Sequence, residues 1–301
     1  MGLGAIPGVS AGTMAIVVGI YDRMISAISN LRKDFKNSFF TLLPLFIGAA
    51  ISAAVLFVAV KFSYQYAPFA IACVFAAFTL GSMPIITKEV KGKPFKSSWI
   101  ILCVVSFLVA AGVGAFSVVA RVLWNFSLQT AFDNREIWVY FAVFAAGFVA
   151  AMACIIPGIS GAMILYIAGL YNPVINLFMG EHAMWKGNGL GTGILLTVLL
   201  LLGVLFGVLV TGKGMEKLLE KHRQATFYVV IGFVLGSVVS MFINQEIWPY
   251  YYGAGLAEGS SSMIIQGWQY GVGAVALVAL TILTLYVIKK HLRKIENTDA
   301  A

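Results

Sequence analysis

The chain has 301 residues, of which 60% are hydrophobic and only 11% are charged. Because a soluble domain carries about 25% charged residues, this composition excludes a soluble enzyme or binding module and indicates a polytopic membrane protein. The formal net charge of +8 is accounted for by membrane topology, so we expect no nucleic-acid partner.

Several apolar runs have the length of helices that cross a bilayer, about 20 residues each. In chain order they lie at about 38–60, 68–87, 99–122, 190–212, 225–243 and 263–288. Two further apolar segments, 1–28 and 137–179, are each interrupted by a Pro-Gly pair. The chain is therefore predicted to be all-α, with a tail at 289–301 after the last span.

An internal repeat relates the two halves of the chain. Residues 7–12 (the first motif) read Pro-Gly-Val-Ser-Ala-Gly, and Gly-Ile-Tyr follows at 19–21. Residues 157–162 (the second motif) read Pro-Gly-Ile-Ser-Gly-Ala, and Gly-Leu-Tyr follows at 169–171. Such self-similarity indicates two copies of one structural unit. Repeat 1 covers 1–122 and repeat 2 covers 137–288, within one integrated membrane domain.

The cationic residues predict the topology. Most Lys and Arg residues fall in four connecting segments, 29–37, 88–96, 213–223 and 289–296. Cytoplasmic loops carry an excess of such residues, so these segments and the C-terminus are expected on the cytoplasmic side. Their charge also suits contact with the anionic headgroups of membrane lipids.

This topology inverts one repeat relative to the other. Span 38–60 runs outward, whereas its repeat partner 190–212 runs inward. Inverted repeats with interrupted helices are a transporter architecture, in which the substrate site lies near the bilayer midplane. The predicted fold is an all-α polytopic integral membrane protein with two inverted-topology repeats.

The motif segments either cross the membrane or dip into it and return. Lys and Arg are absent between Arg135 and Lys186, which favours a Pro-Gly-interrupted re-entrant helical hairpin with its tip in the bilayer. The second copy has a full apolar run, 137–156, before its Pro-Gly pair, whereas the first copy has only residues 1–6 there. Either the start of the chain is too short, or the first copy lacks that helix.

Each motif has the residues of a helix start, because proline and serine suit the first positions of a helix. A helix that restarts near Ser10 or Ser160 leaves up to four backbone N–H groups unpaired and carries about +0.5 of an elementary charge. Phosphate is a usual occupant of such a site. The predicted phosphate-binding residues are Gly8, Ser10, Ala11, Gly12 and Thr13 in the first copy, and Gly158, Ser160, Gly161 and Ala162 in the second.

A buried phosphate dianion also needs a cation, and the candidate charge partners are Arg23 and Arg121. Arg121 ends an apolar span and points either into the cavity or toward the outer headgroups. Arg23 either serves the site or pairs with Asp22. The second copy has Asn172 in place of that aspartate, so these charges are not part of a symmetric site.

Other features leave alternatives open. The three cysteines and three histidines are not spaced as metal ligands, so we expect no metal and no cofactor. No acidic residue lies clearly within a span, so no proton relay is evident, and proton or sodium coupling stays open. A kink that neighbouring helices satisfy is the structural alternative for each motif. Close helix packing accounts for Gly48, Gly81, Gly203 and Gly236.

At the two motifs the sequence resembles the bacterial polyprenyl-phosphate transporter family, formerly a domain of unknown function. The family's signatures look like Pro-Gly-Val-Ser-Gly-Gly-Thr followed by Gly-Ile-Tyr, and Pro-Gly-Ile-Ser-Gly-Ser followed by Gly-x-Tyr. The chain departs from them at Ala11, at Ala162 and in its short N-terminus. The departure at the N-terminus puts the first hairpin in doubt.

The resemblance implies a flippase that returns undecaprenyl phosphate from the outer to the cytoplasmic leaflet of the bacterial plasma membrane. The lipid would then serve again in cell-envelope polymer synthesis, and the protein would not be an enzyme. A small-anion channel or exporter could use the same two helix starts. An enzyme acting on lipid phosphates would need a histidine, paired carboxylates or a metal near the phosphate, and none lies near either motif. A scaffold without transport would leave the matched helix breaks unexplained, and the sequence does not predict the oligomeric state.

Overall fold

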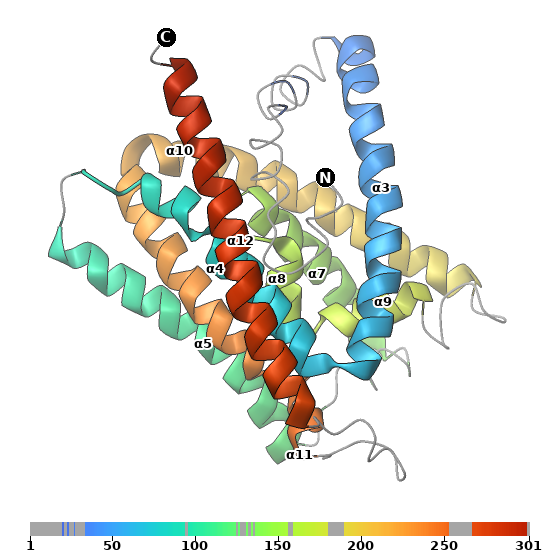
Figure 1. Ribbon diagram of the computed structural model, residues 1–301. Coiled ribbons are helices and arrows are strands. Elements are labelled where there is room, and N and C mark those ends of the chain that lie inside the picture. Colours follow the sequence, from blue (N-terminus) through green and yellow to red (C-terminus); the bar gives the residue numbers. More distant parts are fainter. Residues whose placement is uncertain are drawn as a thin grey trace.

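The computed structural model describes residues 20, 23, 27, 34–93, 96–124, 126, 131, 134, 136–155, 159–179, 190–252 and 267–299. Within these residues the secondary structure is helical and contains no strand (Figure 1). The helices are α3 (Phe35–Tyr66), α4 (Pro68–Lys88), α5 (Ser97–Trp124), α7 (Ile137–Ile155), α8 (Gly161–Ile167), α9 (Tyr171–Met179), α10 (Leu190–Phe242), α11 (Trp248–Tyr252) and α12 (Gly267–Asp299).

Six segments of the described helices are long and apolar enough to cross a membrane. They are Pro68–Lys88, Ser97–Trp124, Ile137–Cys154, Gly191–Val208, Lys221–Phe242 and Gly267–Lys290. The prediction of an all-α polytopic membrane protein is therefore confirmed. The inverted relation of the two repeats and the repeat boundaries stay predictions.

The predicted spans 190–212 and 225–243 are the two helical halves of the continuous element α10. Its backbone leaves the helical conformation at His222, with φ −134° and ψ 34°. The two halves of α10 run in different directions on either side of this kink (Figure 1). A basic, polar stretch at 213–223 therefore continues the helix, and the change of direction is confined to one residue.

Three close helix pairs build the bundle: α10 with α7, α10 with α5, and α12 with α4. Glycines allow the approach, as expected for small residues between membrane helices. A Cβ atom added at Gly81 of α4 would lie 2.5 Å from the Cβ atom of Thr284 of α12. One added at Gly203 or Gly236 would meet a backbone carbonyl oxygen of α7 or α5, respectively.

These contacts confirm the packing interpretation for three of the four glycines. Gly48, in contrast, has no described atom within 4 Å of an added Cβ. Its repeat partner Gly203 packs on Phe144 of α7, a helix that belongs to the second copy. The interpretation of Gly48 as a packing residue stays a prediction.

The cationic segments lie at one end of the molecule. The start of α3, the end of α4, the kink of α10 and the C-terminal end of α12 all lie toward the top of Figure 1, whereas α11 lies at the bottom. At the upper end Arg223 forms an ion pair with Glu89, with 2.8 Å between Nη2 and Oε2. Lys93 lies 3.6 Å from the same carboxylate oxygen. The segments 88–96 and 213–223 are thus on the same side.

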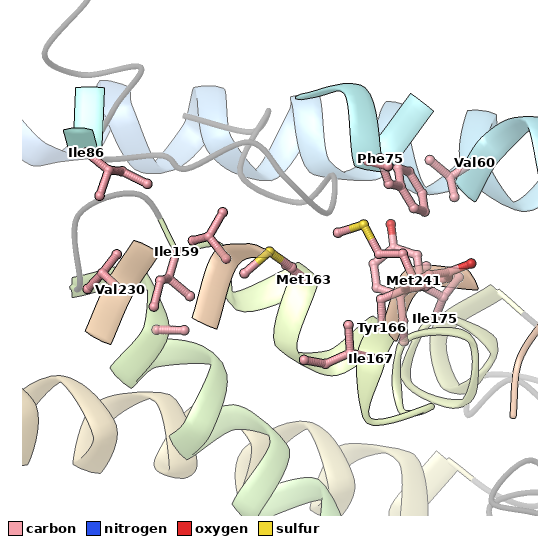
Figure 2. Packing of buried hydrophobic residues seen from close by; sticks show 14 of the residues in the cluster. Val60, Phe75, Ile86, Ile159, Met163, Tyr166, Ile167, Ile175, Val230 and Met241 are labelled. Atoms are coloured by element: carbon pink, nitrogen blue, oxygen red, sulfur yellow. The ribbon is translucent and has the colours of Figure 1, made fainter. Parts of the chain in front are cut away.

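The centre of the core is α8, the short helix that follows the second motif. Its residues Met163, Tyr166 and Ile167 are at most 1% exposed and pack with residues of α4, α9 and α10. The ring of Tyr166 stands edge-on to Phe75 of α4, with 5.3 Å between the ring centroids. Figure 2 shows these side chains gathered between α8 and its neighbours. A motif-bearing helix that is only seven residues long is therefore held almost entirely by tertiary packing.

Candidate functional site

The described residues of the second motif, 159–162, begin the returning arm of a helical hairpin after α7. A Cβ atom added at Gly161, the first residue of α8, would lie 2.5 Å from the carbonyl oxygen of Ala150 near the end of α7. Farther along the chain, Leu170 and Val174 pack against a buried cluster that includes Val139, from the start of α7. The chain after the motif therefore runs back along α7, as the hairpin prediction requires. The depth of the turn in a bilayer stays a prediction.

Ser160 stands at the N-cap position of α8. It is 2% exposed, and its extended backbone (φ −105°, ψ 133°) ends the non-helical turn. Its side chain makes no capping hydrogen bond to the helix. The first hydrogen bond of α8 runs from the N–H of Ile164 to the carbonyl oxygen of Ser160, at 3.2 Å. The N–H groups of Gly161, Ala162 and Met163 thus precede the helical ladder and are the donors that α8 cannot pair within itself.

Gly161 is required at this position for packing. Besides the Ala150 carbonyl oxygen, an added Cβ would lie 3.0 Å from the sulfur atom of Cys154. The N–H of Gly161 is directed to that cysteine. A thiol is a weak acceptor, so a phosphate oxygen would be the stronger partner for this N–H group.

Met163 occupies the third position of α8, where the first copy has Thr13. Its side chain is fully buried, and its sulfur atom accepts a hydrogen bond from the Ser237 hydroxyl of α10 at 3.2 Å. The hydroxyl of Thr79 of α4 lies 4.0 Å from the same sulfur. Each hydroxyl has one proton, and a carbonyl oxygen of its own helix lies at 2.8 Å as the alternative acceptor. The sulfur therefore links the start of α8 to both flanking helices.

The structure brings only part of the predicted site together. Ser160, Gly161 and Ala162 lie together at the start of α8. The predicted residues Gly8, Ser10, Ala11, Gly12, Thr13 and Gly158 lie outside the described residues. Arg23 is helical and exposed. Arg121 is half-buried in the last turn of α5 and interacts electrostatically with Tyr250 of α11.

A carboxyl group that the sequence did not indicate lies at the other end of the hairpin. Glu246 follows α10 in the turn 243–247, and its Oε1 atom accepts a hydrogen bond from the N–H of Asn172 at 3.0 Å. The N–H of Tyr171 also donates to this carboxylate. Both donors belong to the first turn of α9, so Glu246 caps that helix from a distant part of the chain.

The turn that carries Glu246 is fixed by buried polar contacts. Asn244, which is fully buried, accepts a hydrogen bond from the Glu246 N–H at 2.9 Å. The N–H of Gln245 donates to the Ser117 hydroxyl of α5 at 3.0 Å. Gly169, with φ +73°, lies against Gln245, and a Cβ there would approach its Nε2 to 2.6 Å. The end of the hairpin, the end of α5 and the turn after α10 therefore meet at one place.

Burial raises the pKa of the Glu246 carboxyl from 4.5 to about 8, although the N–H groups of Asn172 and Tyr171 act in the opposite direction. The residue keeps some solvent exposure, but its Oε2 atom is buried and has no hydrogen-bond partner among the residues that the structure describes. Burial also raises the pKa values of Tyr171 and Tyr250, so both hydroxyls stay protonated. Within this group, Glu246 is the one that titrates near neutral pH.

The sequence did not single out Glu246, because the residue lies just beyond the predicted span 225–243. A local signal exists, since Asn244-Gln245-Glu246 interrupts an otherwise apolar stretch between Met241 and Trp248. Its packing against α9, however, joins residues 74 positions apart. That contact depends on the tertiary fold and has no signature in the sequence.

The chain is similar to a known family of membrane proteins. The family described as undecaprenyl phosphate translocase-like matches residues 1–254. A polyprenyl-phosphate transporter of Staphylococcus aureus is 30% identical over 242 residues, which cover 79% of this chain and 81% of the relative. A polyprenyl-phosphate transporter of Vibrio cholerae serotype O1 is 28% identical over 260 residues, which cover 81% of this chain and 73% of the relative. No solved structure is significantly similar to the chain.

Proposed function

Because the chain belongs to the undecaprenyl phosphate translocase-like family, we propose that it transports polyprenyl phosphate across the bacterial plasma membrane. The lipid moves from the outer leaflet to the cytoplasmic leaflet and becomes available again for cell-envelope polymer synthesis. The family match over residues 1–254 is the observation that carries this proposal. Transport without chemistry on the lipid fits the second motif, where the polar groups are backbone amides and hydroxyls.

The phosphate binds at the start of α8, where Ser160, Gly161 and Ala162 present backbone N–H groups and a hydroxyl. A charge at mid-bilayer costs about 2.5–3.5 kcal/mol on insertion scales. A helix N-terminus returns up to about 2 kcal/mol, and each hydrogen bond to a charged group about 1.5–3 kcal/mol. A few donors at this helix start, joined by those of the first motif, therefore offset much of the cost of burying the phosphate.

The close helix pairs indicate which helices would move together during alternating access. Within the proposed repeats, α4 of repeat 1 packs on α12 of repeat 2, and α5 of repeat 1 packs on α10 of repeat 2. In each pair the helices pack closely at glycine residues. Because α7 also packs closely on α10, we expect one moving unit of α4 with α12 and another of α5 and α7 with α10.

The competing function is a channel or exporter for small anions that uses the same helix start. A lipid substrate is favoured over a small anion because both relatives are named polyprenyl-phosphate transporters. A lipid substrate also keeps its isoprenoid tail among the exposed aliphatic side chains of α5 and α12, while the phosphate alone enters the protein. The cationic segments, with the C-terminus, face the cytoplasm in this arrangement.

The test is translocation of labelled undecaprenyl phosphate between the leaflets of proteoliposomes, under proton and sodium gradients of either sign. The parent is compared with a Ser10→Ala/Ser160→Ala variant. Ser106→Ala serves as the matched control, because Ser106 is another buried serine but donates to Cys103 of its own helix at 2.9 Å. We expect the double variant to lose most of the transport and the control to keep it. Flux of inorganic phosphate without lipid transport would favour the anion channel instead.

A further inference from the structure

Glu246 lies in a built site rather than on a free surface. Two elements besides its own turn place a titratable group near it, Tyr171 on α9 and Tyr250 on α11. Arg121 on α5 is linked to this group through Tyr250. Tyr250 interacts electrostatically with both Glu246 and Arg121. No ion pair between Glu246 and a basic side chain is present in the described part of the chain. The carboxylate therefore relies on the two N–H groups of α9.

The two oxygen atoms of Glu246 have unequal surroundings. Oε1 accepts the hydrogen bond from Asn172, whereas Oε2 is buried and, as far as the described residues extend, unpartnered. An ionised carboxylate with one unpaired buried oxygen is costly, and taking up a proton removes that charge. The geometry is thus that of a carboxyl group with one fixed oxygen and one oxygen available to a proton.

This carboxyl is connected to the phosphate site through the hairpin. It caps α9 at Tyr171 and Asn172, and only the residues 168–170 separate α9 from the end of α8. The length of α8, seven residues at about 1.5 Å each, puts the carboxyl roughly 10–15 Å from Ser160. At that distance and an effective dielectric constant of about 20, an ionised Glu246 lowers the affinity for the phosphate anion about tenfold relative to a protonated Glu246.

We propose that Glu246 is a proton-binding site that couples proton uptake to phosphate binding at the second motif. The inference rests on the proposed function, since it assigns the coupling ion of the same site. Binding of the phosphate anion favours the protonated carboxyl, which takes its proton from water on the side where α11 lies. Release of the phosphate on the opposite side lets the carboxyl ionise again. One anionic headgroup and one proton are thus bound together.

The first measurement is proton linkage on binding of farnesyl phosphate to the detergent-solubilised full chain. Calorimetry at pH 8 in buffers of different ionisation enthalpy gives the number of protons taken up. We expect net uptake by the parent and by Glu136→Gln, whose carboxylate is exposed, and at least a fivefold smaller uptake by Glu246→Gln. Equal uptake by parent and Glu246→Gln overturns the proposal, as does the absence of uptake by the parent.

The second measurement is transport of labelled undecaprenyl phosphate in proteoliposomes at pH 7 and pH 9. The parent should lose roughly tenfold in apparent affinity at the higher pH, and Glu246→Gln should change less than twofold. An unchanged pH dependence in Glu246→Gln contradicts the coupling. Proton-linked binding without any transport supports the proton site and overturns only the proposed function. Absence of both binding and transport overturns both.

Discussion

The raised pKa of Glu246 has a consequence for stability that does not depend on transport. The folded chain holds the proton up to about pH 8, whereas an unfolded glutamate loses it near 4.5. Between these values the folded state binds more protons than the unfolded state, so the free energy of unfolding falls as the pH rises. Below this pH range the carboxyl is protonated in both states, and above it the carboxyl is ionised in both. Its contribution to the free energy of unfolding is therefore constant outside the range.

The size of this change in the free energy of unfolding depends on the pH range between the two pKa values. Each pH unit within it changes the free energy of unfolding by about 1.36 kcal/mol, so the change from pH 5.5 to 7.5 amounts to about 2.7 kcal/mol. For a chain of this size that corresponds to a shift in the unfolding midpoint of about 5 °C. Replacing Glu246 with glutamine removes the titrating group and should remove this shift.

The assay is thermal unfolding of the detergent-solubilised chain at a series of pH values, for the parent, Glu246→Gln and the control Glu136→Gln. The parent and the control should unfold at lower temperature as the pH rises from 5.5 to 7.5, while Glu246→Gln should show a much flatter profile. A parent midpoint that rises over this range, or a Glu246→Gln profile parallel to the parent, would show that burial does not raise the pKa of Glu246.

Three further experiments test contacts between the described residues. Gly161→Ala places a Cβ atom 2.5 Å from a carbonyl oxygen of α7 and should lower the free energy of unfolding by about 1–3 kcal/mol. Gly112→Ala is the control, because Gly112 has open space around it, and it should not destabilise the chain. Equal thermal unfolding midpoints for the two variants would contradict the hairpin geometry. Met163→Ala empties a fully buried position and should cost about 2–5 kcal/mol, measured by thermal unfolding, and a loss below 1 kcal/mol would mean that the start of α8 is loosely packed. A double-mutant cycle on Arg223 and Glu89 should give a coupling free energy below about 1 kcal/mol, because the Arg223 side chain is 56% exposed. A much larger coupling free energy would indicate that the ion pair is buried.

The sequence was sufficient for the membrane class, most helix positions and the second helix start. Apolar runs of spanning length became α4, α5 and α12 with ends within a few residues of prediction at most boundaries, because such runs have few alternatives in a bilayer. The Pro-Gly-Ile-Ser pattern predicted a helix beginning beside Ser160, and α8 begins at Gly161.

The remaining features depend on contacts between distant residues. The predicted spans 190–212 and 225–243 are joined without a loop, because the basic stretch between them stays helical up to the kink at His222. Which helices pack together, such as α4 with α12, depends on contacts between a small residue on one helix and a larger residue on the other, as at Gly81 and Thr284. The capping of α9 by Glu246 depends on the same three-dimensional arrangement, which a one-dimensional pattern does not contain.

The proposed function is the movement of a phosphate-bearing isoprenoid lipid between leaflets. The most direct measurement is the appearance of labelled undecaprenyl phosphate in the opposite leaflet of proteoliposomes that contain the purified full chain, with protein-free liposomes as the reference. We expect translocation well above the reference, and its loss in Ser10→Ala/Ser160→Ala protein that still folds. A folded parent that leaves the lipid in its original leaflet under every proton and sodium gradient would contradict it.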